Sequence, residues 1–158
     1  MGKPVVLFVC SHNSARSQMA EGLLRHLAGD RFEVASAGVQ PGTLNPLSVR
    51  AMAEDGIDIS SHRAKGVKEL LGNIAVHHLI VVCDKAAETC PRVWPGMRER
   101  HFWPFDDPSA ATGTDEERLA FFCRVRDEIR AKIEHWLREL DQESTGTAAS
   151  ARSVEPTG

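Results

Sequence analysis

Apolar and polar positions alternate along the chain in two distinct periods. Runs of apolar and β-branched residues predict strands over 4–9, 32–38, 77–83 and 99–105. Apolar positions three and four residues apart, with capping and terminating residues, predict helices over 14–28, 46–54, 66–72 and 114–140. Because strands alternate with helices, the pattern predicts an α/β fold with a doubly wound parallel sheet.

Several helix boundaries have clear chemical signals. Asn45 followed by Pro46 is typical of an N-cap and a first helical residue. Thr114 and Glu117 have the spacing of a capping box. After that box, one apolar stripe predicts a long helix packed against the core: Leu119, Phe122, Ile129, Ile133, Trp136, Leu137 and Leu140.

The end of the chain has a different composition. Residues 142–158 contain almost no large apolar side chain and are rich in Ser, Thr, Gly and Ala. Burial cannot offset the entropy of ordering such a segment, so we expect a disordered tail. The other residues, 1–141, have a length typical of one domain.

Composition narrows the classes of function. The net charge of −3 offers no basic excess for binding nucleic acid. No apolar run approaches the roughly 20 residues of a membrane helix, and the N-terminus lacks a secretory signal. We therefore expect a cytoplasmic protein, and a monomer. In that compartment the four cysteines are buried hydrophobic residues or reactive thiols, not a disulfide framework.

Candidate functional residues follow three of the predicted strands. Cys10 ends the first strand, Cys83 ends the third, and Asp106 and Asp107 follow the fourth. In doubly wound sheets, ligands bind beyond the carboxyl ends of the strands. The order of elements therefore predicts that these side chains gather at one edge of the sheet.

The segment between the first strand and the first helix has the features of an anion-binding loop. Its backbone N–H groups and the helix N-terminus favour an oxyanion, and Arg16 offers a bidentate guanidinium. The same positive potential favours an anionic, nucleophilic sulfur at Cys10. The alternative is a structural cysteine beside a surface arginine. The loop residues are Ser11, His12, Asn13, Ser14, Ala15, Arg16 and Ser17.

The stretch VLFVCSHNSARSQMAEG resembles the active-site segment of low-molecular-weight protein tyrosine phosphatases and of the arsenate reductases that share their fold. The resemblance extends over residues 4–140. It implies a three-layer, flavodoxin-like domain with a four-stranded parallel sheet flanked by helices. It also implies that Cys10 is the nucleophile, that Arg16 and the loop amides hold the anion, and that an Asp before a proline is the general acid. Asp107 precedes Pro108 and fits that role, with Asp106 as the alternative.

A pair of further cysteines distinguishes the arsenate reductases from the phosphatases. Cys83 and Cys90 lie seven residues apart and Pro91 follows them, as in the arsenate reductases that use thioredoxin. The resemblance implies reduction of arsenate by a relay from Cys10 to Cys83 to Cys90, with reduced thioredoxin as the electron donor. The alternative for the pair is two core cysteines. On a helix, seven residues span about 10 Å, whereas α-carbons in a disulfide are roughly 4.4–6.8 Å apart. The segment 83–90 is therefore expected to unwind when it is oxidised.

Two other functions remain open. One is a phosphatase in which the cysteine pair protects Cys10 from oxidation, and the other is a thiol-based oxyanion or redox sensor. The chain contains no tyrosine, and small residues follow Pro108 where tyrosine phosphatases usually place an aromatic side chain. Trp94 and Trp103 are the candidates to replace it. The missing tyrosine favours a small inorganic substrate, and weak phosphatase activity is expected beside it.

The sequence gives little support for a bound metal or cofactor. His77 and His78 are adjacent on a strand and would point to opposite faces, and no Cys/His group has zinc spacing. Three positions match a potassium site found in some thioredoxin-linked reductases, namely Asn13, Glu21 and Ser36. Lys65 stands at the fourth position, so we expect its ammonium to replace the ion. No bound cofactor is expected, and Cys123 is interpreted as a core thiol.

Overall fold

The computed structural model describes residues 2–145 and contains one parallel sheet. Its strands are β1 (Val5–Cys10), β2 (Glu33–Gly38), β3 (His78–Val81) and β4 (Glu99–Phe102). Their order in the sheet is β2-β1-β3-β4, and every neighbouring pair is parallel. The predicted α/β fold with a four-stranded parallel sheet is confirmed.

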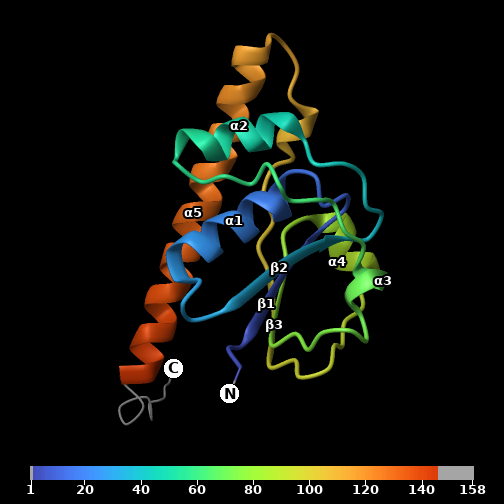
Figure 1. Ribbon diagram of the computed structural model, residues 1–158, viewed down its shortest axis with the longest axis vertical. Coiled ribbons are helices and arrows are strands. Elements are labelled where there is room, and N and C mark those ends of the chain that lie inside the picture. Colours follow the sequence, from blue (N-terminus) through green and yellow to red (C-terminus); the bar gives the residue numbers. More distant parts are fainter. Residues whose placement is uncertain (1, 146–158) are drawn as a thin grey trace, which may run out of the picture.

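Helices cover both faces of this sheet (Figure 1). They are α1 (Arg16–Ala28), α2 (Pro46–Glu54), α3 (Val67–Leu70), α4 (Asp84–Thr89) and α5 (Asp115–Thr145), with a 3₁₀ turn at Pro108–Ala110. Helices α1, α2 and α5 pack together on one side, and α3 and α4 lie on the other (Figure 1). The domain therefore has the expected three layers.

The core is centred on β1, where Val6, Leu7, Phe8 and Val9 have no solvent exposure. A strand buried on both faces needs a continuous apolar run, which this segment has. The stripe of α5 closes one face of the core with buried side chains at Phe122, Val125, Ile129, Ile133 and Trp136. None of the helices in residues 2–145 is long and apolar enough to cross a membrane.

The boundaries of the predicted elements lie within two residues of the prediction, except at the ends of β4 and α5. Helix α1 begins at Arg16 instead of residue 14, because residues 11–15 turn toward the segment after β2. There the N–H of Gln40 donates to the Ser11 carbonyl over 2.8 Å. Strand β3 ends at Val81, and β4 ends at Phe102, since the chain leaves the sheet toward the loops.

The start and the end of α5 can be compared with the capping box and the domain end that the sequence predicts. The expected capping box is present, since Glu117 N–H donates to Thr114 Oγ1 (3.1 Å) and Thr114 N–H donates to Glu117 Oε1 (2.8 Å). The helix continues to Thr145, four residues past the expected domain end at 141. The remainder of the expected tail, 146–158, lies outside the described residues.

The strand order creates a switch point between β1 and β3. The chain leaves β1 through α1 to reach β2 on one side, and later returns to β3 on the other side. Parallel sheets of this type form a crevice at that point, beyond the carboxyl ends of the two central strands. Cys10 and Cys83 both lie there.

Candidate active site

The turn between β1 and α1 presents backbone N–H groups to a small pocket. Ala15 is the N-cap of α1 and no side chain caps the helix, which leaves its first N–H groups available to a ligand. Asn13 adopts a left-handed backbone (φ 54°), a conformation that asparagine tolerates better than most residues. The loop therefore has the geometry of an oxyanion site.

The Cys10 sulfur is buried at the base of this loop, with the residue 3% exposed. Its Sγ lies 2.9 Å from Ser17 Oγ, and the backbone N–H of Asn13 donates to it over 3.2 Å. These polar contacts hold the sulfur in place at the base of the anion loop. The contacts are those required of a nucleophilic thiolate.

A buried polar network fixes the shape of the loop. The Asn13 amide donates to Ser17 Oγ (2.7 Å) and to Ser36 Oγ (2.9 Å). Gln18, fully buried on α1, donates to the Asn13 carbonyl (3.2 Å) and to its Oδ1 (2.9 Å). Sequence analysis did not identify Gln18. A long polar side chain on the buried face of a helix was the available signal, because such a group must find partners.

Gly38 is the second residue that sequence analysis missed. A Cβ at this position would lie 2.7 Å from the backbone of both His12 and Asn13, closer than real Cβ contacts. Glycine is therefore required where the end of β2 supports the loop. A glycine at the end of a predicted buried strand was the signal in the sequence.

Arg16 and Asp107 close the opposite side of the pocket. The Arg16 guanidinium donates to the Phe105 carbonyl (3.1 Å), and its Nη2 lies 3.6 Å from Asp107 Oδ2. A cavity of about 80 Å³ lies between these groups, lined by Cys10, His12, Ser14, Ala15, Arg16, Asp107 and Ser109. The structure thus brings together the predicted sulfur, arginine and acid.

Asp106, the alternative acid, lies elsewhere. Its carboxylate pairs with Arg124 of α5 at 2.9 Å and is largely exposed. Asp107 instead caps the following 3₁₀ turn, where its Oδ1 accepts from Ser109 N–H (2.9 Å), and its other oxygen faces Arg16. Only Asp107 of the two lines the cavity.

The second thiol lies next to the anion loop. Cys83 Sγ is 3.3 Å from Ser11 Oγ, the residue that directly follows Cys10. Cys83 is also the N-cap of α4, where its sulfur accepts from Ala86 N–H over 3.4 Å. A second cavity of about 290 Å³ connects Cys83 with Arg16 and Asp107. The two sulfurs therefore open into adjoining spaces.

The third thiol, Cys90, lies at the opposite end of α4 and is buried. Burial raises the pKa of Cys90 to about 11, although the Arg100 guanidinium opposes the shift. All cysteines in the described residues are free. Because α4 separates Cys83 from Cys90 by seven residues, their α-carbons are about 10 Å apart along a helix and cannot form a disulfide in this conformation.

The high pKa of Cys90 gives a testable pH dependence. The thiolate, not the thiol, reacts with iodoacetamide. Alkylation of Cys90 in the folded, reduced protein should therefore accelerate about tenfold per pH unit until the pH approaches 11. Peptide mass spectrometry after timed labelling measures the rate at each cysteine. Fast labelling of Cys90 at neutral pH would contradict the expectation.

Neither candidate tryptophan reaches the anion pocket. Trp94 is buried next to the segment 83–90, where its Nε1 donates to the Pro91 carbonyl (3.1 Å). Trp103 packs in the core against Phe8 and Trp136. The cavity at Cys10 is also far smaller than the roughly 300–1,000 Å³ of typical organic ligand sites. The pocket therefore suits a small inorganic anion better than an aryl ester.

Lys65 lies beside Glu21, one of the three residues that match a potassium site in related reductases. Ser36 Oγ donates to Glu21, and Lys65 Nζ lies 3.8 Å from Glu21 Oε1. Burial lowers the pKa of Lys65, and the charge of Glu21 opposes that shift. The ammonium is thus placed beside the carboxylate that would otherwise hold a cation.

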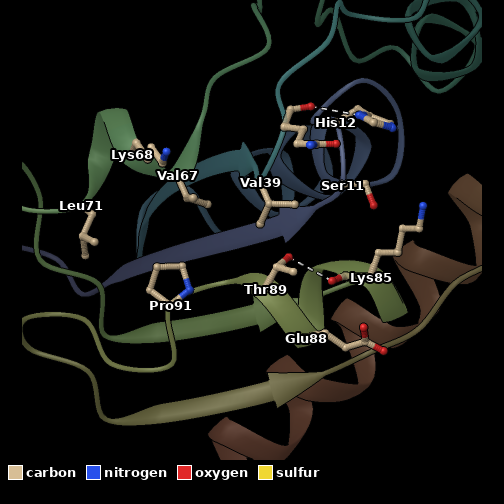
Figure 2. Close-up of a pocket in the computed structure, with 11 residues that line it drawn as sticks. Ser11, His12, Val39, Val67, Lys68, Leu71, Lys85, Glu88, Thr89 and Pro91 are labelled. Atoms are coloured by element: carbon tan, nitrogen blue, oxygen red, sulfur yellow. Dashed lines mark hydrogen bonds between the residues drawn. The ribbon is translucent and has the colours of Figure 1, made fainter.

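A wide groove runs beside the site between α3 and α4 (Figure 2). It has a volume of about 600 Å³, with Val67, Lys68 and Leu71 on one wall and Lys85, Glu88 and Thr89 on the other. Ser11 and His12 of the anion loop lie at one end (Figure 2). One side of α4 therefore faces open space.

The chain is similar in sequence to a known family and to several arsenate reductases. Residues 5–146 match the family described as low molecular weight phosphotyrosine protein phosphatase. The chain is 46% identical over 134 residues to an arsenate reductase of Halalkalibacterium halodurans, which covers 84% of this chain and 94% of that protein. It is 42% identical over 137 residues to an arsenate reductase of Bacillus subtilis, with 86% and 96% covered.

Solved structures of arsenate reductases are similar to this chain in fold. An arsenate reductase in its phosphate-binding state superposes with a TM-score of 0.73 at 27% identity, covering 86% of this chain and 98% of that one. A thioredoxin-dependent arsenate reductase of Corynebacterium glutamicum has a TM-score of 0.68 at 27% identity, covering 90% of this chain and 64% of that one.

Proposed function

Since this chain belongs to the low molecular weight phosphotyrosine protein phosphatase family and is similar over most of its length to the family's arsenate reductases, we propose that it reduces arsenate to arsenite. The observation that favours reduction over hydrolysis is the position of Cys83. Its sulfur touches the loop that holds Cys10, and a third free thiol lies at the far end of the same short helix. Ester hydrolysis needs only the first sulfur, whereas repeated reduction with recycling by thioredoxin uses all three.

The first step is attack by the Cys10 thiolate on arsenate held by the loop N–H groups and Arg16. A sulfur–arsenic bond forms and one arsenate oxygen leaves, protonated by Asp107. Asp107 faces the Arg16 guanidinium across 3.6 Å, so the same arginine positions both the anion and the acid. Arsenic is still in the +5 state after this step.

The second step transfers the electrons. Cys83 attacks the Cys10 sulfur, a Cys10–Cys83 disulfide forms, and arsenic leaves as arsenite with the electron pair of the sulfur–arsenic bond. Cys90 then attacks the Cys83 sulfur, which releases the Cys10 thiolate and leaves a Cys83–Cys90 disulfide. Reduced thioredoxin supplies two electrons and two protons to reopen it.

The segment 83–90 must unwind for this last exchange. Helix α4 has only six residues, too few to be stable by itself, and Pro91 follows it closely. The groove in Figure 2 lies along its open side and offers room for the rearrangement. In the folded helix, Cys90 is buried and protonated, so the exchange waits until the segment opens.

The decisive experiment is arsenate turnover with thioredoxin, thioredoxin reductase and NADPH. The wild type should turn over repeatedly, and Cys83→Ser should release no arsenite. Brisk aryl-phosphate hydrolysis without arsenate reduction would instead establish the phosphatase alternative. Replacing thioredoxin by glutaredoxin with glutathione tests the reductant. Because the relay needs reduced thiols, we propose that the protein acts in the cytoplasm. We also propose that it acts as a monomer, since every thiol of the relay comes from one chain.

Gly38→Ala should lower arsenate turnover by about 10²-fold, since a methyl group there must displace the anion loop and small displacements of reacting groups are costly. Gly42→Ala is the matched control. Its added Cβ would meet the His12 side chain at 3.6 Å, an ordinary contact, and turnover should stay near wild type. Steady-state NADPH oxidation measures both variants, and equal losses in the two would contradict the expectation.

Potassium should not stimulate the reaction. Lys65 already places an ammonium 3.8 Å from the Glu21 carboxylate, where a cation would bind. Rates measured in KCl and in NaCl at equal ionic strength are therefore expected to agree. A rate rise specific to potassium would disprove the replacement of the ion by Lys65.

A further inference from the structure

Two histidines and one glutamate gather on one face of the sheet, away from the active site. His78 begins β3, and it is paired in register with Glu99, which begins β4. His101 lies two residues after Glu99, so both side chains point to the same face. Trp136 of α5 packs edge-on against both histidine rings, with centroids 5.3 and 5.7 Å away.

The ligand atoms converge on one point. Glu99 Oε1 lies 3.3 Å from His78 Nδ1 and 3.1 Å from His101 Nε2, and one potential ligand atom from each residue lies within 4.8 Å of the others. Zinc binds imidazole nitrogen and carboxylate oxygen at about 2.0–2.2 Å, which places neighbouring ligands roughly 3.0–3.5 Å apart. The two nitrogen–oxygen distances have this size.

His78 Nδ1 has an unmet requirement. The side chain is 9% exposed, and its Nδ1 atom is buried without a hydrogen-bond partner among the described residues. Glu99 Oε1 lies 3.3 Å from this nitrogen, where it is an ion-pair partner only for a protonated His78, and His101 Nε2 lies 3.1 Å from the same oxygen. A buried polar atom without a partner is costly, and a metal ion between the three groups would satisfy it.

We propose that His78, Glu99 and His101 bind a divalent transition-metal ion of the zinc class. Two imidazoles and one carboxylate form a ligand set that suits such ions. Glu99 is 47% exposed and His101 is 22% exposed, so an ion can enter from solvent and keep a water ligand on that side. The ion would tie the edge strand β4 to β3.

This site is separate from the anion pocket. His78 and Glu99 begin their strands, whereas Cys10 and Cys83 lie at or beyond the opposite, carboxyl ends. Sequence spacing did not reveal the set, because the nearest pair, Glu99 and His101, is two residues apart and the third ligand comes from another strand. His77 is not part of this set, and its Nδ1 accepts from Val5 N–H (2.8 Å).

Cobalt(II) is a suitable probe because its visible spectrum distinguishes nitrogen and oxygen ligands from thiolates. Titration of the reduced, metal-free, full-length protein under argon should show one saturable site without a thiolate charge-transfer band. Tryptophan emission should fall in parallel, since Trp136 lies against both histidines. No saturable binding, or a thiolate spectrum, would overturn the proposal.

Two variants and one control locate the ion. His101→Gln and Glu99→Gln should each weaken cobalt binding about tenfold or more. His135→Gln should not, because that exposed histidine pairs with Glu139 of α5, 3.4 Å away, and lies outside the cluster. Thermal unfolding without metal checks that each variant is folded. If His101→Gln does not fold, Glu99→Gln still tests the site, because Glu99 is half exposed. Unchanged affinity in a folded Glu99→Gln variant would also overturn the proposal.

Discussion

Cys90→Ser is expected to release about one arsenite per enzyme and then stop. The first two steps use only Cys10 and Cys83, so a single reduction proceeds and leaves a disulfide between them. A serine hydroxyl cannot attack that disulfide. An external dithiol also cannot reach it readily, because Cys10 and Cys83 are each only 3% exposed. The enzyme should therefore remain trapped in the oxidised form.

The trapped state can be measured directly. Arsenite is quantified against enzyme concentration, and peptide mapping without reductant identifies the Cys10–Cys83 link. Cys123→Ser is the matched control, since that thiol lies on α5 and donates to Glu54 Oε1 (3.3 Å), outside the relay. It should turn over like the wild type. Repeated turnover by Cys90→Ser would show that electrons from the reductant reach the Cys10–Cys83 disulfide by another route.

Arg16→Lys is expected to lower kcat/KM for arsenate by about 10²–10³-fold, the usual cost of removing an oxyanion donor. The guanidinium has one side facing the pocket, and it donates to the Phe105 carbonyl. A lysine keeps the charge but cannot hold the anion bidentately while it also bonds to that carbonyl. Loss of this anchor also removes the partner of Asp107.

Arg124→Lys is the control for this effect. Arg124 pairs with Asp106 at the surface, next in sequence to the proposed acid, so the substitution is chemically identical but lies outside the pocket. Its kcat/KM should stay close to wild type. If both variants lose activity equally, the effect comes from packing against α5 and not from anion binding.

Local signals in the sequence were sufficient for much of the fold. The continuous apolar run of β1, the Asn45 cap and the Thr114–Glu117 capping box each act within a few residues, and each is present in the structure. Cys10 and Arg16 flank a single turn, so their encounter in one pocket also follows from local geometry. Such features need no knowledge of the rest of the chain.

Contacts between distant segments were not predictable in the same way. That Asp106 pairs with Arg124 while Asp107 faces Arg16 depends on where α5 packs. The role of Gly38 depends on how closely β2 approaches the loop, and Gln18 also donates to the Arg63 carbonyl, 45 residues away in the sequence. Tertiary packing decides each of these contacts, and the amino-acid sequence alone does not reveal that packing.

By itself, the sequence predicted an α/β domain with Cys10 as a nucleophile in an anion loop and two further thiols seven residues apart. Only the tertiary structure showed that Cys83 touches the loop, that Cys90 is buried and protonated, and that His78, Glu99 and His101 converge. The physical reason is the same in each case. Periodicity and capping act along the chain, whereas sheet register and helix packing decide which distant side chains meet and which lose contact with water.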